Sequence, residues 1–321
     1  MVPLVQRFQM SSLLFLALFL AMTCHTNGFL KKDHAVTITG CFKCGGYPIA
    51  NCRVKLMDED LIFHDTLAES WTDNNGCFAL SGKGRDGLWG RPDIFAELEY
   101  NYLNKMRIRN FWGFTRDARS SVKDNHSGFH NFGMININDE HCRAYVRFRA
   151  AIIDYISRSG NSALPYSYLK VQTKSVLTAG KPWATTDKIR LPSGYSLDAE
   201  TAKHELAHTI RHTLDGSILH AAYDAVRFKY AQYHTCIKIT NFGFAFNEGW
   251  AEYWEGQCSC TLGDGKDMRV EGNVAAALCV LANCTGDEKM VNTLETNEGE
   301  IHSYNSFKNA LCAKYPGGSC C

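Results

Sequence analysis

A His-Glu-x-x-His motif at residues 204–208 is the stretch of this sequence best suited to chemistry. If the segment is helical, His204 and His208 lie one turn apart on the same face, where both imidazoles can bind one metal ion. Glu205 lies beside them and can take a proton from a water molecule at the metal. A five-residue motif with three fixed positions also occurs by chance, so the competing interpretation is a core helix with two incidental histidines.

The residues around the motif predict a well-framed helix. Ser196 and Asp198 offer side-chain oxygens for an N-terminal cap, and Gly216 offers a stop at the other end. Leu206 and Leu214 fall on the face opposite the histidines, where they would pack in a core. One face is therefore expected to carry chemistry and the other to carry packing.

A catalytic zinc site needs three protein ligands and one open coordination position. One known arrangement takes a further histidine six residues after His208, but that position is Leu214. The segment 244–255 offers another: it is predicted to be helical, with Glu248 and Glu252 one turn apart on one face and aromatic residues on the other. We expect Glu248 to complete the zinc site and Glu252 to accept the ring N–H of a ligand histidine. The alternative is an acidic amphipathic helix without metal.

Together, the two segments resemble the gluzincin metallopeptidases. Residues 247–255 (Asn-Glu-Gly-Trp-Ala-x-Tyr-x-Glu) are similar to the Asn-Glu-Gly-Phe-Ala-x-Tyr-x-Glu segment of zinc aminopeptidases. The resemblance implies that His204, His208 and Glu248 bind zinc and that Glu205 is the general base. The spacer between the segments is longer than in those aminopeptidases, and their Gly-x-Met-Glu-Asn motif for a free amino terminus does not occur here. Aminopeptidase specificity is therefore not expected.

Other residues near these segments have a less specific pattern. His302 and Tyr304 lie where many zinc peptidases place a donor for the oxyanion of the tetrahedral intermediate, although surface or helix-capping roles fit them equally well. His220 and His234 fall in the long spacer between the two segments, and we predict structural roles for both.

The N-terminal part has a β pattern. Apolar and polar residues alternate in short runs between about residues 36 and 102, with a strong turn signal at Asp73-Asn-Asn-Gly76. This spacing predicts a small β-sandwich. The order and spacing of its motifs resemble the transthyretin-like domain of secreted animal proteins, in the segments 36–48, 54–60 and 72–82. The resemblance implies a binding or spacer module and assigns it no catalytic residue.

These patterns predict an α+β protein in which a transthyretin-like β-sandwich precedes a mainly helical, zincin-like domain with a small sheet. From residue 142 onward the apolar period becomes helical, and two short strand-like runs precede the His-Glu motif. The expected divisions are a signal peptide at 1–28, the sandwich at 35–102, a linker at 103–140 and the metallopeptidase domain at 141–321.

Several features indicate a secreted protein. Arg7 followed by an apolar run at 12–22 is typical of a signal peptide and is too short to span a bilayer comfortably. The fourteen cysteines are expected to form mostly disulfides outside the cell, and if Cys24 leaves with the leader, one of the remaining thirteen is unpaired or links two chains. Asn125 and Asn283 begin glycosylation sequons. The net charge of +1 predicts neither a nucleic-acid partner nor, after signal cleavage, a membrane partner.

The sequence therefore predicts a secreted zinc metallopeptidase that cleaves peptide or protein substrates, with Glu205 as general base. The main alternative is a secreted binding protein in which the transthyretin-like module carries the function and the zinc site is structural or vestigial. An intact glutamate at 205 favours the enzyme, because a purely structural site needs no base there. Zinc-dependent hydrolysis of a non-peptide ester or amide fits the same ligands.

Overall fold

The computed structural model describes residues 33–60, 64–86, 90–178, 180–216, 218–230, 233–317 and 320–321. Within these residues the chain forms two β-sheets and seven helices, in agreement with the α+β prediction. The predicted signal peptide lies outside the described residues. None of the described helices is both long enough and apolar enough to cross a membrane.

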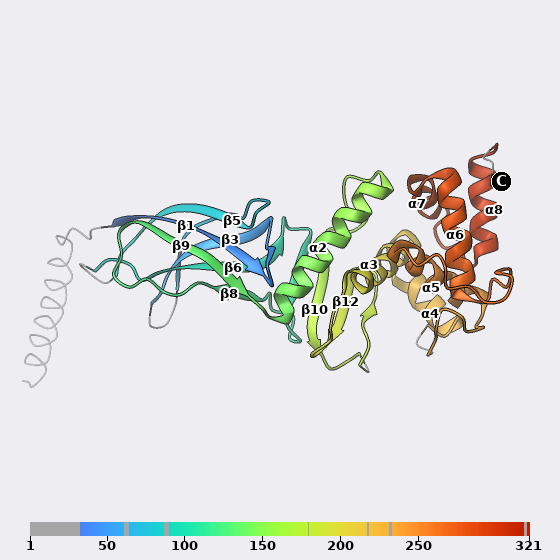
Figure 1. The fold of residues 1–321 in the computed structure, drawn as a ribbon, viewed down its shortest axis with the longest axis horizontal. Coiled ribbons are helices and arrows are strands. Elements are labelled where there is room, and N and C mark those ends of the chain that lie inside the picture. Colours follow the sequence, from blue (N-terminus) through green and yellow to red (C-terminus); the bar gives the residue numbers. More distant parts are fainter. Residues whose placement is uncertain are drawn as a thin grey trace, which may run out of the picture.

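The two sheets lie at the N-terminal end of the molecule, and one of them continues beyond it (Figure 1). The four-stranded sheet has the order β2-β1-β5, with β9 pairing in parallel with β1. Its strands are β1 (His34–Cys44), β2 (Tyr47–Pro48), β5 (Cys77–Gly84) and β9 (Gly128–Ile137).

The eight-stranded sheet has the order β11-β12-β10-β7-β6-β3-β4, with β8 paired to β6. Its strands are β3 (Cys52–Asp58), β4 (Asp65–Trp71), β6 (Ile94–Tyr102), β7 (Met106–Arg109), β8 (Asp117–Arg119), β10 (Leu169–Ser175), β11 (Trp183–Ala184) and β12 (Lys188–Pro192). Because β7 pairs with both β6 and β10, one sheet runs from the N-terminal sandwich into the C-terminal half.

The prediction of a linker at 103–140 is corrected by the structure. This segment contains β7, β8 and β9, which are strands of the two sheets. Strand β9 has no buried residue, and β7 and β8 are four and three residues long. A strand that is very short or fully exposed shows little alternation of apolar and polar residues, so the sequence of this segment is typical of a loop.

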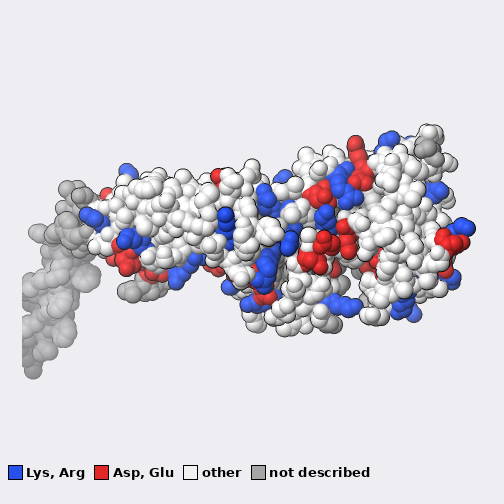
Figure 2. Space-filling view, in the orientation of Figure 1, with Lys and Arg blue, Asp and Glu red and all other residues white. Residues whose placement is uncertain are grey.

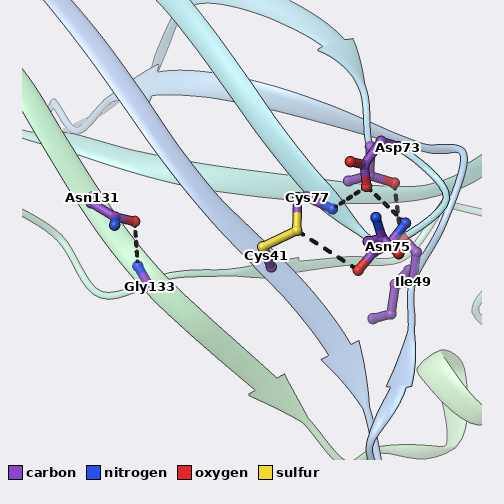
Figure 3. The surroundings of a disulfide bond; sticks show 8 residues. Cys41, Ile49, Asp73, Asn75, Cys77, Asn131 and Gly133 are labelled. Atoms are coloured by element: carbon purple, nitrogen blue, oxygen red, sulfur yellow. Dashed lines mark hydrogen bonds between the residues drawn. A yellow bond between two sulfur atoms is a disulfide. The ribbon is translucent and has the colours of Figure 1, made fainter.

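The predicted turn at residues 73–76 is present beside a disulfide (Figure 3). The Asp73 carboxylate accepts hydrogen bonds from the backbone N–H groups of Asn75 and Cys77, both at 2.8 Å. Gly76 has a φ of 78°, a left-handed conformation that glycine adopts without strain. This turn brings Cys77 to its disulfide partner Cys41.

Six disulfides join twelve cysteines of the described chain, and the buried Cys52 is its one free thiol. The pairs are Cys41–Cys77, Cys44–Cys142, Cys236–Cys260, Cys258–Cys279, Cys284–Cys320 and Cys312–Cys321. Burial raises the pKa of the Cys52 thiol to about 12, so this thiol stays protonated and unreactive. Such a disulfide set is consistent with secretion.

The helices cover one face of the eight-stranded sheet and extend beyond its end. They are α2 (Glu140–Ser159), α3 (Ala199–Leu214), α4 (Ile218–Arg227), α5 (Phe242–Glu255), α6 (Glu271–Thr285), α7 (Asp287–Glu295) and α8 (Tyr304–Lys314). Helix α2 packs on β6, β7 and β10 and also on α3 (Figure 1). The Tyr145 hydroxyl donates to the carbonyl of Ala50 at 2.9 Å, and the Cys44–Cys142 disulfide also fixes α2 to the sandwich.

Candidate metal centre

Helix α3 presents the His-Glu motif as the sequence predicts. Asp198 is its N-cap, and the side chain accepts the N–H of Thr201 at 2.7 Å. Leu206 and Ile210 are buried in the core on the inner face. His204 and His208 therefore lie one turn apart on the opposite face, with their rings 4.8 Å apart between centroids.

Helix α5 crosses α3 and supplies the third ligand. Asn241 caps its start by accepting the N–H of Phe244 at 2.9 Å. Gly249 lets α5 lie against α6, because a Cβ at this position would be 2.7 Å from the carbonyl oxygen of Glu271. This packing fixes the position of α5 along its axis and so determines where Glu248 faces α3.

Three ligand atoms converge between the two helices. His204 Nε2 and His208 Nε2 are 3.1 Å apart, and Glu248 Oε2 is 3.4 Å from the first and 3.2 Å from the second. These residues are the one group of three such side chains in the described chain whose ligand atoms lie close enough to share an ion. The predicted ligand set is thus brought together.

The spacing of these atoms fits a zinc ion. Ligand bonds of about 2.0–2.1 Å at tetrahedral angles place neighbouring ligand atoms about 3.3 Å apart, and the three separations here range from 3.1 to 3.4 Å. Two imidazole nitrogens and one carboxylate oxygen form a donor set that zinc favours in catalytic sites. The chain's own geometry therefore fits the metal.

Glu255, and not the predicted Glu252, holds a ligand histidine. His204 Nδ1 donates to Glu255 Oε2 at 2.9 Å, which turns the lone pair of Nε2 toward the other ligands. Glu252 Oε2 is buried without a hydrogen-bond partner. Burial and the charge of Glu271 raise the pKa of Glu252 to about 8. The role predicted for Glu252 is held by Glu255, which lies about 20° from Glu248 around the helix axis, whereas Glu252 lies about 40° from it. The Glu255 carboxylate is the one that contacts His204 Nδ1.

Asn247 orients the other oxygen of Glu248. Its amide nitrogen donates to Glu248 Oε1 at 3.0 Å, while its amide oxygen accepts from Arg211 at 2.9 Å and lies 3.2 Å from His212 Nε2. His212 thus faces Asn247 instead of the ligands, and burial lowers its pKa to about 3. These hydrogen bonds hold the Glu248 carboxylate in one orientation.

The charge state of the cluster favours a cation. Burial opposes charge on Glu248, but the charges and hydrogen bonds of His208 and His204 outweigh it and hold the pKa of Glu248 well below its usual range. Five acids lie around the histidines, namely Glu205, Glu248, Glu252, Glu255 and Glu271, and burial raises the pKa of Glu205 and of Glu252. A divalent ion bound among them would favour the ionised forms of these acids.

Glu205 is placed as a base. It is 7% exposed and lines the cavity beside the ligands, and its Oε2 is buried without a hydrogen-bond partner among the described residues. Burial raises the pKa of the Glu205 carboxyl. A carboxylate oxygen in this position can accept a proton from a water molecule held at the ligands.

His234 lies at the centre although the sequence predicts a structural role for it. Its Nδ1 is 2.9 Å from Glu271 Oε2, and its Nε2 is 3.8 Å from Glu248 Oε2. Glu271 itself is 1% exposed. The sequence carries no signal for this pair, because His234 lies in an irregular segment and Glu271 comes from the start of α6.

His302 and Tyr304 lie elsewhere in the fold. His302 Nδ1 is 2.8 Å from Asp224 Oδ2 on α4, and Tyr304 begins α8 behind its N-cap Ser303. The wall of the cavity, as far as the chain is described, includes neither residue.

A cavity of about 800 Å³ opens in front of the ligands, which is within the usual size of small-ligand and peptide sites of about 300–1,000 Å³. It is bounded on one side by β11, an edge strand of the eight-stranded sheet, and on another by α4. Its wall includes Trp183, Ala184, Tyr195, Ala221, Tyr230 and His234.

Comparisons with known proteins bear mainly on the N-terminal part. A solved 9R-lipoxygenase from Cyanothece aligns at 13% identity with a TM-score of 0.23, over 64% of this chain and 27% of that one, and this likeness is too low to support an inference. No curated protein matches the chain. Residues 39–96 match the model of the transthyretin-like family. This match confirms the resemblance of the N-terminal domain to that family.

Proposed function

We propose that this protein is a secreted zinc-dependent metallopeptidase. The observation that carries the proposal is the convergence of His204, His208 and Glu248 beside the unpaired, buried carboxylate oxygen of Glu205. A structural zinc site would need a fourth protein ligand in place of an open position and would have no use for that carboxylate.

Glu205 performs the proton transfers of the proposed reaction. A zinc ion bound by the three ligands would lower the pKa of a coordinated water to about 7 and polarise the scissile carbonyl. Glu205 accepts the proton that the water loses as its oxygen attacks the carbonyl carbon. The same carboxyl then donates this proton to the leaving amine, so cleavage yields one carboxylic acid and one amine.

His234 is the residue best placed to stabilise the oxygen of the attacked carbonyl. It lines the cavity and lies just outside the ligand cluster, while Glu271 holds its Nδ1 and leaves Nε2 pointing to the ligands. Burial lowers the pKa of His234, but the hydrogen bond to Glu271 and the charge of Glu248 outweigh it and raise this pKa, which favours the protonated ring. The protonated ring donates from Nε2, and this hydrogen bond strengthens as negative charge develops on the carbonyl oxygen. We therefore assign His234 the role predicted for His302 and Tyr304.

The position of β11 supports an extended peptide as the substrate. Among the described residues, strand β11 pairs only with β12, in the antiparallel direction, and Trp183 and Ala184 of β11 line the cavity. A free strand edge offers backbone N–H and C=O groups to a peptide that adds as a further strand. The cavity beyond the ligands would then receive one or two side chains.

The test uses the full secreted chain, loaded with zinc and incubated with a mixed peptide library whose cut sites are read by mass spectrometry. Wild type should cleave, a chelator should abolish cleavage, and added zinc should restore it. Glu205→Gln should retain zinc by atomic absorption and lose about 10²-fold or more of activity. His234→Ala should lower kcat and also keep its zinc. Undiminished cleavage by Glu205→Gln would overturn the proposed mechanism.

The transthyretin-like match favours one competing function, a binding protein with a structural metal site. Residues 39–96 match the transthyretin-like family, and none of the three ligands or Glu205 lies in that range. If the zinc-loaded wild type cleaves no peptide and Glu205→Gln leaves stability and zinc content unchanged, the binding function is the better one.

A further inference from the structure

One face of the eight-stranded sheet carries a block of cations that the metal centre does not use. The basic face consists of Arg107 and Arg109 on β7, Lys170 on β10, and Lys188 and Arg190 on β12. Alternate residues of the same strands, such as Ile108, Val171 and Ile189, are buried on the side that α2 and α3 cover. The basic face therefore points away from these helices.

Strand register places the cations side by side in two rows. Lys170 is paired with Arg107 on one side and with Lys188 on the other. In the next row Gln172 lies between Arg109 and Arg190. Neighbouring strands are about 4.8 Å apart and next-but-one residues about 6.6 Å apart, so the block measures about 10 by 7 Å at the backbone.

The same face of the sheet is electrically balanced nearer the N-terminus. Arg53 lies 2.5 Å from Glu69 and 3.4 Å from Glu99, and Lys55 lies 3.2 Å from Glu97. The strands β3 and β6 thus pair each cation with acids. Like charges on adjacent strands are destabilising, so a sheet face normally alternates in this way.

The basic face lacks this compensation. Asp187 lies 2.5 Å from Lys170 Nζ, and in the described part of the chain the other four cations form no ion pair. Burial and the charges of Arg190, Lys170 and Arg109 lower the pKa of Lys188, which shows how closely the cations lie. The net charge of +1 does not reveal such local separation of charges. Figure 2 shows another example on a different part of the surface, where Lys and Arg gather over α2 and acids gather beside them.

Exposed aromatic rings border the basic face at both ends. Gln172 Nε2 donates to the carbonyls of Asn110 and Phe111 and so anchors a loop in which Trp112 is 78% and Phe114 71% exposed. On the other side, the Arg190 guanidinium lies 4.9 Å from the centroid of the half-exposed Trp183 ring. Exposed aromatic rings beside cations that form no ion pair are a feature of binding sites.

We propose that the basic face binds a sulfated polysaccharide. Sulfate groups along such a chain supply the negative charges that Asp187 alone does not, and the C–H faces of the sugar rings can pack on the electron-rich faces of the tryptophans. The disulfides are consistent with a location outside the cell, whereas anionic phospholipids gather in the cytoplasmic leaflet. The inference goes beyond the proposed peptidase function and does not depend on it, because the cations lie outside the metal centre.

The test measures binding of the full secreted chain to immobilised heparin at several salt concentrations. Lys188→Ala/Arg190→Ala should weaken binding more than about tenfold and lower the slope of log K against log salt by about 1 for each cation removed, as for other linear polyanions. The matched control, Lys83→Ala/Lys266→Ala, removes two exposed cations far from this face and should bind like wild type. Circular dichroism of both variants checks the fold.

The ligand class is tested with competitors at equal charge. Desulfated heparin should compete at least tenfold less well than heparin, and vesicles containing phosphatidylserine and duplex DNA should also compete less well. The proposal is overturned if wild type does not bind heparin, if both double variants lose binding equally, or if vesicles or DNA bind more tightly. If Lys188→Ala/Arg190→Ala does not fold, Lys188→Gln alone replaces it and should weaken binding in the same direction.

Discussion

Glu252 and Glu255 lie about one turn apart on α5, but their carboxylates have different surroundings. Glu255 accepts the ring N–H of His204, and Glu252 Oε2 has no partner. We predict that Glu255→Gln lowers zinc affinity about tenfold or more, because a neutral acceptor orients the ring less well and makes its Nε2 less basic. Competition with a chelating dye measures this affinity. The control Glu252→Gln should have a smaller effect, and the reverse order would contradict the assignment.

Asp58 gives a second prediction at the residue scale, in the transthyretin-like part. Burial raises the pKa of Asp58 from 3.8 to about 6, helped by the charges of Asp60, Asp86 and Asp93 and opposed by a hydrogen bond from the Asp93 N–H. Between these pH values the folded state binds more protons than the unfolded state. The protonated Asp58 carboxyl therefore makes its full contribution to the stability of the folded protein below about pH 4, and this contribution is lost as the pH rises through about 6.

We predict that Asp58→Asn removes this pH dependence, because an amide takes up no proton on folding. The difference in Tm between the variant and wild type should rise from pH 4 to pH 7, as followed by circular dichroism. Asp65→Asn, which changes an exposed residue on the neighbouring strand β4, is the control. A Tm difference for Asp58→Asn that falls over this range would contradict the assignment.

The site residues that lie on helices with a clear apolar period could be predicted from the sequence, and those in irregular segments could not. His204, His208 and Glu248 follow from helical spacing, and the same rule could have identified Glu255, seven residues after Glu248. His234 could not be found in this way. Its place beside Glu248 depends on an irregular segment and on the contact of that segment with α6, and spacing within the sequence encodes neither.

At the scale of elements, the contact between α5 and α6 holds the third ligand in place. We predict that Gly249→Ala destabilises the protein by about 1–3 kcal/mol, because the new methyl group would overpack the interface. It would lie 2.7 Å from the Glu271 carbonyl oxygen and from Val274 Cβ. Thermal unfolding measures the loss. Val280→Ala, on the exposed side of α6, should change Tm little, and equal effects would show that the helices are not in close contact.

The sequence predicts where helices such as α3 begin and end, but it does not predict which helices pack against each other. Asp198 and Gly216 mark the ends of α3 in the sequence, and the apolar periodicity correctly places Tyr145, Phe148 and Ile152 on the buried face of α2. Helix α5 is buried on all sides from Gly243 to Trp254, so its period indicates no single buried face. That α5 packs on α6 through Gly249 depends on a close backbone approach between segments. A single glycine in a helical pattern does not reveal such a contact.

At the scale of the whole molecule, one hydrophobic core runs through both halves. Met106 and Ile108 of β7 are fully buried, and β7 is hydrogen-bonded to the sandwich strand β6 and to β10, whose Leu169 and Val171 are also fully buried. The sequence predicted two domains and a linker because the strand that joins them is only four residues long. Because the two halves share one sheet and one core, we expect them to unfold as one cooperative unit.

This continuity predicts that the C-terminal half does not fold alone. A chain of residues 141–321 lacks β7, so the edge of β10 and the apolar side of α2 are exposed, and Cys142 has no Cys44 to pair with. Residues 33–321 should show one cooperative thermal transition in circular dichroism and resist limited proteolysis, whereas residues 141–321 should show neither property. A fragment 141–321 that melts cooperatively and binds zinc as tightly as the longer chain would show that the shared sheet is dispensable, and the metal centre would then be an independent domain.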